Sequence, residues 1–246
     1  MIYNILTVKF GNKYDSEFVN KLYREICYFS RGYYINRWIN FYCYTDNPEG
    51  LMHGINVIPA KTDPTLKGVW NKLRLFDPSM PYVRKGHYNI YLDLDTFVQD
   101  CIFTRFSHFG EKDWSTLHVC GAPWKSDKNR YGRLSSYDVT IHSSVMSWNA
   151  LSQFEIWNHF SNNGLRDYYM RKYSGGMDRF LAHEDINMKT FKRGFVRSMK
   201  HDKNIKDAAI VSFEELDVRL GDLISNYKTK RENISVSYTH LRAHET

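Results

Sequence analysis

The sequence predicts an α/β fold, in which a mixed, mostly parallel sheet is flanked by helices. One observation is the order of the first elements, which are apolar, strand-like runs at 2–8, 39–45 and 55–59 with an amphipathic helical stretch between the first two. This order favours parallel strands joined by right-handed crossovers. The other is the run at 89–98, an apolar strand that ends in an Asp-x-Asp pair, as strands of open α/β sheets do where ligands bind.

The first helix is predicted from its cap and its apolar stripe. Asp15 or Ser16 can accept a hydrogen bond from the first turn, and the acidic Glu17 suits that turn. The stripe consists of Phe18, Leu22 and Ile26, with Val19 and Tyr23. The strand at 39–45 is then closed by the turn-forming segment 46–50.

A second helical stretch is predicted at 68–76. Val69, Leu73 and Phe76 share one face at helical spacing, and Lys72 lies at the edge of that face. Lys72 could extend out of the core toward a ligand. Alternatively, it is a surface lysine whose aliphatic part covers the apolar stripe.

Short strands and helices alternate in the second half of the chain. Strands are expected at 117–122 and 139–148, with a polar loop at 125–137 between them. The triplet His142-Ser143-Ser144 interrupts the second strand, and its small side chains either admit a ligand or simply pack. Further helices are expected at 150–162, after Gly175-Gly176-Met177-Asp178, and at 214–227. The glycine pair either presents Asp178 at a helix start or forms an ordinary N-cap.

Composition limits the class of protein. The chain has 246 residues, enough for one large α/β domain or two small ones, and its net charge is +7 with a pI near 9.1. Such a charge suits an anionic partner, and nucleic acid is one candidate. The lysines and arginines are nevertheless dispersed, which favours a solvated surface and some attraction for a phosphorylated donor. We therefore expect no nucleic-acid partner.

The chain carries no obvious targeting or membrane signal. No apolar run reaches the length of a transmembrane helix, and residues 1–8 lack a basic region and a cleavage site. The four cysteines show no metal-ligand spacing, so we expect reduced thiols in a cytoplasmic protein. Residues 236–246 resemble a translated sequencing adapter. We accordingly expect one domain at 1–235, truncated at its C-terminal end, and a non-native tail at 236–246.

The Asp93-Leu94-Asp95 segment carries the chemistry. Side chains alternate along a strand, so the two carboxylates are expected to point the same way. Convergent carboxylates suit a hard cation such as Mg²⁺ or Mn²⁺, which could neutralise a diphosphate. The alternative is that the two aspartates only end a strand and enter a turn.

Together these segments resemble a known family. The chain is similar to bacterial and viral glycosyltransferases of the GT-A fold, close to the glycosyltransferase family eight-like proteins. The matching blocks occur in order over most of residues 2–213. They are 5–14, 41–50, 68–73, Tyr91-Leu92-Asp93-Leu94-Asp95-Thr96, 142–146 and 176–178.

The resemblance implies roles for individual residues. A nucleoside diphosphate sugar donor would contact Thr7, Lys9, Tyr14, Lys72, Asp93, Ser143 and Ser144. Asp93 and Asp95 would ligate Mn²⁺ or Mg²⁺, while Lys72 would meet the diphosphate as a point charge. Asp178 would act beside the reacting sugar, where it would orient hydroxyls or assist proton transfer. The acceptor hydroxyl could belong to a glycan, a lipid or a protein.

Two departures from the family pattern leave alternatives open. His142 stands where the family usually has asparagine, and Glu214-Glu215 stands where a late histidine would complete the metal site. Glu214 could serve as that ligand. Otherwise the chain is a sugar-nucleotide-binding protein that has lost turnover. A metal-dependent phosphatase of the haloacid dehalogenase type also uses Asp-x-Asp, but Phe97 occupies a position where it requires threonine or valine.

Overall fold

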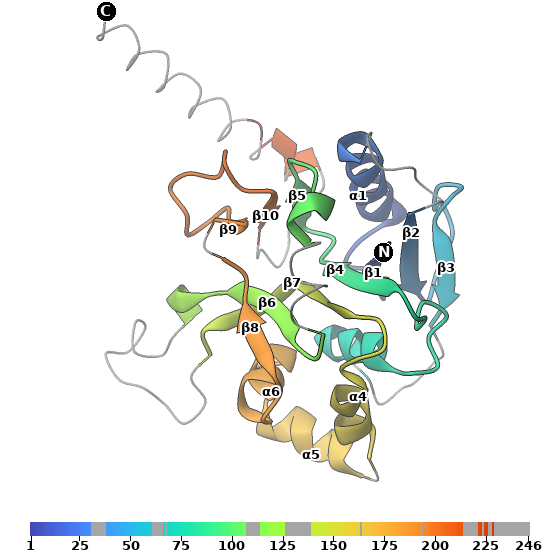
Figure 1. Cartoon of the computed structure of the whole chain (residues 1–246), viewed down its shortest axis with the longest axis vertical. Helices are drawn as coiled ribbons and strands as arrows, with labels where there is room; N and C mark the ends of the chain where they lie inside the picture. Colours follow the sequence, from blue (N-terminus) through green and yellow to red (C-terminus); the bar gives the residue numbers. More distant parts are fainter. Residues whose placement is uncertain are drawn as a thin grey trace, which may run out of the picture.

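The chain is described by a computed structural model (Figure 1). It covers residues 1–30, 38–60, 66, 68–106, 114–125, 139–162, 164–192, 194–213, 221, 222, 224, 225 and 228. Glu214, the tail at 236–246, and most of the loop at 125–137 and of the helix at 214–227 lie outside these residues. Their predicted roles stay predictions.

A seven-stranded sheet in the order β3-β2-β1-β4-β7-β6-β8 forms the centre of the described chain. Its strands are β1 (Ile2–Lys9), β2 (Ile39–Thr45), β3 (Asn56–Pro59), β4 (His87–Leu92), β6 (Leu117–Gly121), β7 (Ile141–Asn149) and β8 (Met188–Thr190). The strands β3, β2, β1 and β4 are mutually parallel, as are β6 and β8, whereas β7 runs antiparallel to both neighbours. The predicted mixed, mostly parallel sheet is confirmed.

A smaller sheet, which the sequence did not predict, pairs β5 (Thr96–Val98), β10 (Ile210–Ser212) and β9 (Val196–Ser198) in that order. Each of these strands is three residues long, too short to show a periodic pattern. The small sheet begins directly after Asp95. It therefore ties the Asp-x-Asp segment to a part of the chain more than a hundred residues away.

The helices differ from the predicted ones in extent and type. They are α1 (Ser16–Phe29), α4 (Phe154–Ser161), α5 (Leu165–Lys172) and α6 (Met177–His183), with the 3₁₀-helices η1 (Gly68–Phe76) and η2 (Pro123–Lys125). Asp15 caps α1 as predicted, accepting a hydrogen bond from the amide of Glu17 at 3.0 Å. Three corrections follow. The stretch at 68–76 is a 3₁₀-helix, α4 is shorter than 150–162, and α5 was not predicted.

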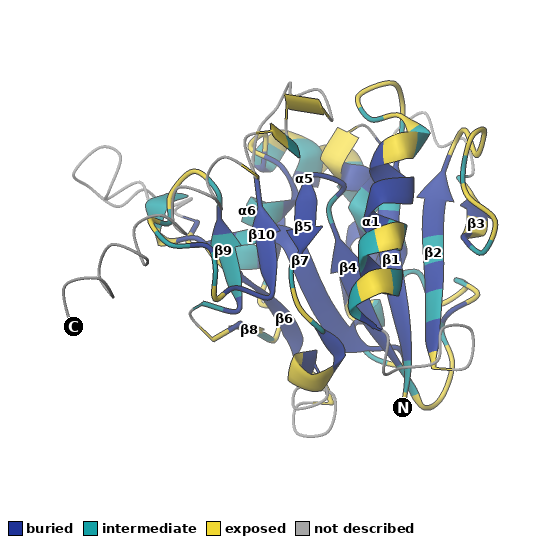
Figure 2. Cartoon of the chain, turned by 90° about the horizontal axis from the view of Figure 1, so that it is seen from above, coloured by how far each residue is buried: buried dark blue, intermediate teal, exposed yellow. Residues whose placement is uncertain are grey.

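The main sheet separates two apolar cores, because residues of β1 alternate between its faces. Ile5 packs with Leu22 of α1 and Val211 of the small sheet. Leu6 lies in the other core, which η1, α4, α5 and α6 complete. Figure 2 shows buried strands beneath α1, whose outer face is exposed. Within the described residues, no helix is long and apolar enough to cross a membrane.

Candidate functional site

A cleft of about 320 Å³ opens at the carboxyl ends of β1 and β4. Its walls also include the start of η1, the first residues of β7 and the start of α6. Six of the predicted site residues line it: Tyr14, Lys72, Asp93, Asp95, Ser143 and Asp178. This is the edge of the sheet at which ligands of open α/β folds bind.

The two aspartates of the Asp-x-Asp segment lie in a turn rather than in a strand. Strand β4 ends at Leu92 and β5 begins at Thr96, so the strand alternation that we expected to orient the aspartates does not apply. The turn is closed by Thr96 instead. Thr96 donates to the carbonyl oxygen of Asp93 from both its amide (3.2 Å) and its hydroxyl (2.7 Å). Both carboxylates reach the cleft by this route.

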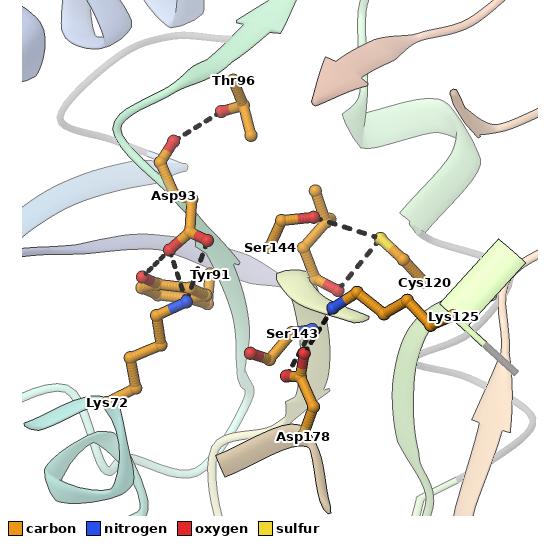
Figure 3. A network of polar contacts seen from close by, with 10 residues as sticks. Lys72, Tyr91, Asp93, Thr96, Cys120, Lys125, Ser143, Ser144 and Asp178 are labelled. Atoms are coloured by element: carbon orange, nitrogen blue, oxygen red, sulfur yellow. Dashed lines mark hydrogen bonds and ion pairs between the residues drawn. The ribbon is translucent and has the colours of Figure 1, made fainter. Parts of the chain in front are cut away.

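Lys72 extends from η1 to the carboxylate of Asp93 (Figure 3). Its Nζ lies 2.7 Å from Oδ1 and 2.8 Å from Oδ2, and the hydroxyl of Tyr91 donates to the same carboxylate. The Lys72 side chain is only 12% exposed, so it is not the surface lysine of the alternative interpretation. Burial alone would lower its pKa, but the neighbouring Asp93, Asp178 and Asp95 raise the pKa above its ordinary value.

Asp95 is 8% exposed and carries no lysine of its own at contact distance in the described chain. Burial raises the pKa of its carboxyl from 3.8 to about 6, and the negative charge of Asp93 adds to this rise. Lys72 and Lys13 oppose it only partly. Asp95 is therefore a carboxylate that would gain from a nearby cation.

The donor set fits a hard divalent cation in part. Asp93 and Asp95 offer carboxylate oxygens, the ligand type that Mg²⁺ and Mn²⁺ prefer. Among the described residues, no three His, Cys, Asp or Glu side chains gather into a metal site. Glu214, the predicted third ligand, lies outside those residues. A cation here would need further oxygens from a bound diphosphate or from water.

Asp178 lies on the opposite wall, in the first turn of α6 (Figure 3). Its Oδ1 accepts the backbone amide of Ser143 at 3.0 Å, and its Oδ2 lies 2.8 Å from Nζ of Lys125. Burial would raise the pKa of Asp178, but His142, Lys125 and Lys72 together hold it well below its usual range. The side chain is thus a fixed, permanently ionised carboxylate.

A glycine shapes the approach to Asp178. Gly176 has φ of +99°, a conformation that side chains rarely tolerate, and a Cβ there would meet Cγ2 of Val69 at 3.1 Å. The glycine pair therefore presents Asp178 at the start of α6 while η1 comes close. The amide of Arg179 closes the turn by donating to the Gly176 carbonyl at 3.2 Å.

The structure also shows a site residue that sequence reasoning missed. Lys125 ends η2, and 53 positions separate it from Asp178, its partner. No local pattern marks it, because in the sequence it stands at the start of a polar stretch rich in charged residues. The tertiary fold brings its charge to Asp178.

Three predicted donor-binding residues are not among the lining residues of the cleft. Thr7 is fully buried within β1, and the Nζ of Lys9 donates to the carbonyl oxygen of Asn47 at 3.1 Å. The hydroxyl of Ser144 lies 3.8 Å from Sγ of Cys120, behind the cleft wall. Strand β7 runs through His142, Ser143 and Ser144, but its pairing with β6 shifts register there, from Val119 opposite Met146 to Cys120 opposite His142, so the predicted interruption is present as an irregularity in the pairing. The donor roles of these three residues stay predictions.

Comparison with known proteins adds information on the fold. The chain matches no protein-family model, and no curated protein sequence matches it significantly. Solved structures do match. The galactosyltransferase LgtC in complex with donor and acceptor sugar analogues superposes with a TM-score of 0.53 at 11% identity, over 86% of this chain and 87% of that one. An active-site mutant of LgtC gives 0.56 at 11% identity, over 92% and 95%.

These similarities confirm the predicted GT-A-like fold and the predicted resemblance to family-eight glycosyltransferases at the level of structure. They extend over most of both chains. The described chain therefore shares the overall fold of these LgtC structures. At such low identity the similarity concerns the fold, and the activity has to be argued from the cleft.

Proposed function

We propose that this chain is a glycosyltransferase, which moves a sugar from a nucleoside diphosphate sugar to an acceptor hydroxyl in a metal-dependent reaction. The observation that carries the proposal is the cleft, in which Lys72, Asp93, Asp95 and Asp178 meet on a GT-A-like fold. The similarity to a galactosyltransferase favours this reaction over phosphate-ester hydrolysis. The donor sugar, the base and the acceptor remain unassigned.

The two walls of the cleft suggest a division of labour. We call Lys72, Asp93 and Asp95 the turn wall, and Ser143 and Asp178, with Lys125 as the ion-pair partner of Asp178, the helix wall. Asp93 and Asp95 would hold Mn²⁺ or Mg²⁺, which when bound supplies positive charge to a departing diphosphate. Lys72 would contribute a second positive charge to the same leaving group.

The helix wall would act on the sugar. Glycosyl transfer develops positive charge at the sugar ring, and an ionised carboxylate stabilises such charge. Asp178 has that ionisation state, and the Ser143 amide and Lys125 fix its orientation. Fixed orientation matters, because preorganised charges need no reorganisation during the reaction. We therefore assign Asp178 the role of stabilising the reacting sugar.

A second candidate is a sugar-nucleotide-binding protein without turnover. It is favoured by the two ion pairs, since Lys72 and Lys125 already occupy the carboxylates of Asp93 and Asp178. For turnover, a bound donor would have to draw Lys72 away from Asp93. This interpretation predicts tight nucleotide binding with no transfer and no donor hydrolysis.

One experiment separates the two. The protein is incubated with a panel of nucleoside diphosphate sugars, with Mn²⁺ or with a chelator, and release of nucleoside diphosphate is measured without acceptor and with pooled glycan, lipid and peptide acceptors. Metal-dependent release from one donor supports the transferase. Binding of a nucleoside diphosphate without release from any donor supports the binding protein. Absence of both would contradict the proposal.

A further inference from the structure

A buried ion pair lies behind the turn wall. Lys21 and Glu25 occupy successive turns of α1 with 3.3 Å between Nζ and Oε2, and both side chains are largely shielded from water. Charged groups of this kind are rarely buried, because each loses its hydration. Burial lowers the pKa of Lys21 to about 8, so the amine is still protonated at neutral pH. Replacing such a pair by apolar residues is often neutral, so stability alone does not explain it.

Both side chains bind the backbone of β5. Lys21 donates to the carbonyl oxygen of Thr96, and its Nζ lies 3.3 Å from the centroid of the Phe97 ring. Glu25 accepts the amide of Val98 at 3.1 Å. Strand β5 is at the edge of the small sheet, with β10 on one side only. Lys21 and Glu25 therefore satisfy the outward backbone groups that a neighbouring strand would otherwise pair.

The other edge of the same short segment is held by the small sheet. The amide of Gln99 donates to the carbonyl of Ala209 at 2.9 Å, and the amide of Phe213 donates to the carbonyl of Asp95 at 3.2 Å. Thr96, which Lys21 holds, itself closes the turn by donating to the Asp93 carbonyl. The exit of the turn is thus held on one side by β10 and on the other by α1.

We propose that Lys21 and Glu25 are positioning residues, which hold the Asp93–Thr96 turn so that Asp95 faces the cleft. We call the contacts of Lys21 with Thr96 and of Glu25 with Val98 the clamp. Its role in orienting Asp95 for metal binding rests on the proposed function, whereas the contacts themselves are present in the fold without ligand. A purely structural pair would dock α1 onto β5 and leave the turn unaffected when replaced. A positioning pair would be needed for the metal-dependent part of nucleotide binding.

The test is the double variant Lys21→Met with Glu25→Gln. Lys21→Met alone would leave a buried carboxylate unpaired and could unfold the protein, whereas the double variant removes both charges and keeps an acceptor for the Val98 amide. We expect a folded protein whose melting temperature is somewhat lowered, because the Thr96 carbonyl loses its donor. The amide of Thr96 should exchange with solvent at least about tenfold faster, since its turn has lost one anchor. Affinity for nucleoside diphosphate with Mn²⁺ should fall by about tenfold, and affinity without metal should not change.

Two controls bracket this result. Glu25→Gln alone keeps the bond from Lys21 to Thr96, so the Thr96 amide should stay slow in the folded variant, although the unpaired Lys21 should lower the melting temperature. Glu17→Gln with Arg24→Met removes the exposed ion pair of the same helix, at 3.1 Å, and should alter neither measurement. Wild-type exchange at Thr96 in the folded double variant would overturn the clamp. Faster exchange with unchanged metal-dependent affinity would overturn its positioning role.

Failure of the proposed function has a separate signature. If the wild type itself binds no nucleoside diphosphate in a metal-dependent way, the functional assignment is wrong. Exchange at Thr96 in the ligand-free protein then decides alone whether Lys21 and Glu25 hold the turn. Unchanged exchange would reject the clamp in that case too.

Discussion

The two walls of the cleft use the same residue types but reach opposite electrostatic states. On the turn wall Lys72 contacts the carboxylate of Asp93 but not that of Asp95, and the pKa of Asp95 rises to about 6. On the helix wall a single carboxylate, Asp178, has Lys125, His142 and a backbone amide around it, and its pKa falls. The turn wall thus has an excess of negative charge, whereas the helix wall is balanced.

This difference shows how local charge balance can divide a site between two partners. A wall with uncompensated carboxylates favours a cation, and a cation brings a diphosphate with it. A balanced wall with an ionised acid favours a neutral sugar on which positive charge develops. Substitutions on each wall can test whether one wall binds the nucleotide and the other acts on the sugar.

The largest effect is expected at the helix wall. Asp178→Asn keeps the shape and can still accept the Ser143 amide, but it removes the negative charge. We expect donor turnover to fall by about 10²–10³, the scale seen when a preorganised electrostatic contact is removed. Nucleoside diphosphate affinity should stay within about twofold. Asp185→Asn, an exposed position just beyond α6, is the matched control. Full turnover in Asp178→Asn would reduce Asp178 to a helix-start residue.

On the turn wall, the Asp95 carboxylate should lower the stability of the fold while serving metal-dependent nucleotide binding. Because the pKa of Asp95 is higher in the folded protein than in the unfolded chain, ionisation of this carboxyl opposes folding. Protonated Asp95 contributes its full stabilisation below pH 3.8, and this stabilisation is lost as pH rises through about 6. The difference between the ordinary pKa of 3.8 and the folded-state pKa of about 6 corresponds to roughly 3 kcal/mol, at about 1.4 kcal/mol per pKa unit. Asp95→Asn should therefore raise the free energy of unfolding at pH 8 by up to that amount and change little near pH 4. Urea denaturation at the two pH values measures this.

The exposed Asp100→Asn serves as a control for Asp95→Asn. It should leave the free energy of unfolding nearly unchanged at both pH values. If Asp95→Asn does not raise the free energy of unfolding at pH 8, the ionised Asp95 carboxylate does not destabilise the folded wild type. The turn wall would then lose the charge excess on which the comparison depends.

Variants of Lys72 and Lys125 should show most clearly that the two walls have different functions. Lys72→Met should weaken nucleoside diphosphate binding by about 1.5–3 kcal/mol, the value of a hydrogen bond to a charged group. It should also lower the melting temperature, because Asp93 loses its buried partner. Lys125→Met should leave nucleotide affinity unchanged and lower turnover. Calorimetry measures nucleotide affinity, and a donor-hydrolysis assay measures turnover. Equal effects of the two variants on nucleotide affinity would show that the two walls do not have separate functions.

The smallest effect is the pH dependence. Asp95 becomes protonated as pH falls through about 6, so Mn²⁺-dependent nucleotide binding should weaken between pH 7 and pH 5. Asp178 stays ionised over this interval, because its pKa lies below its usual range. Titrations of the wild type at pH 5, 6, 7 and 8 measure the change. Constant affinity over this range would exclude Asp95 as the titrating ligand.

The regular half of the fold could be predicted from sequence because its signals are local. Strand β1 is a mostly apolar run and was placed to within one residue, and the cap and stripe of α1 gave its start and its buried face. The short strands β5, β9 and β10 could not be found, since three residues carry no periodicity. They exist because tertiary packing against α1 and the main sheet stabilises them.

The site followed the same rule. Asp93, Asp95, Lys72 and Asp178 stand in short motifs, and the structure brings all four to one cleft. Lys125 and Lys21 stand in no motif, and their partners lie 53 and 75 positions away. Contacts at such a distance along the chain can only be found once the fold has brought the elements together.

The most direct test of the account is calorimetric titration of a panel of nucleoside diphosphates into the protein, with and without Mn²⁺, for the wild type and for Asp95→Asn. We expect at least one nucleoside diphosphate to bind the wild type about tenfold or more tightly with Mn²⁺ than without it, and Asp95→Asn to lose this gain but keep the metal-free affinity. Equal affinity with and without Mn²⁺, or a full metal-dependent gain in Asp95→Asn, would contradict it.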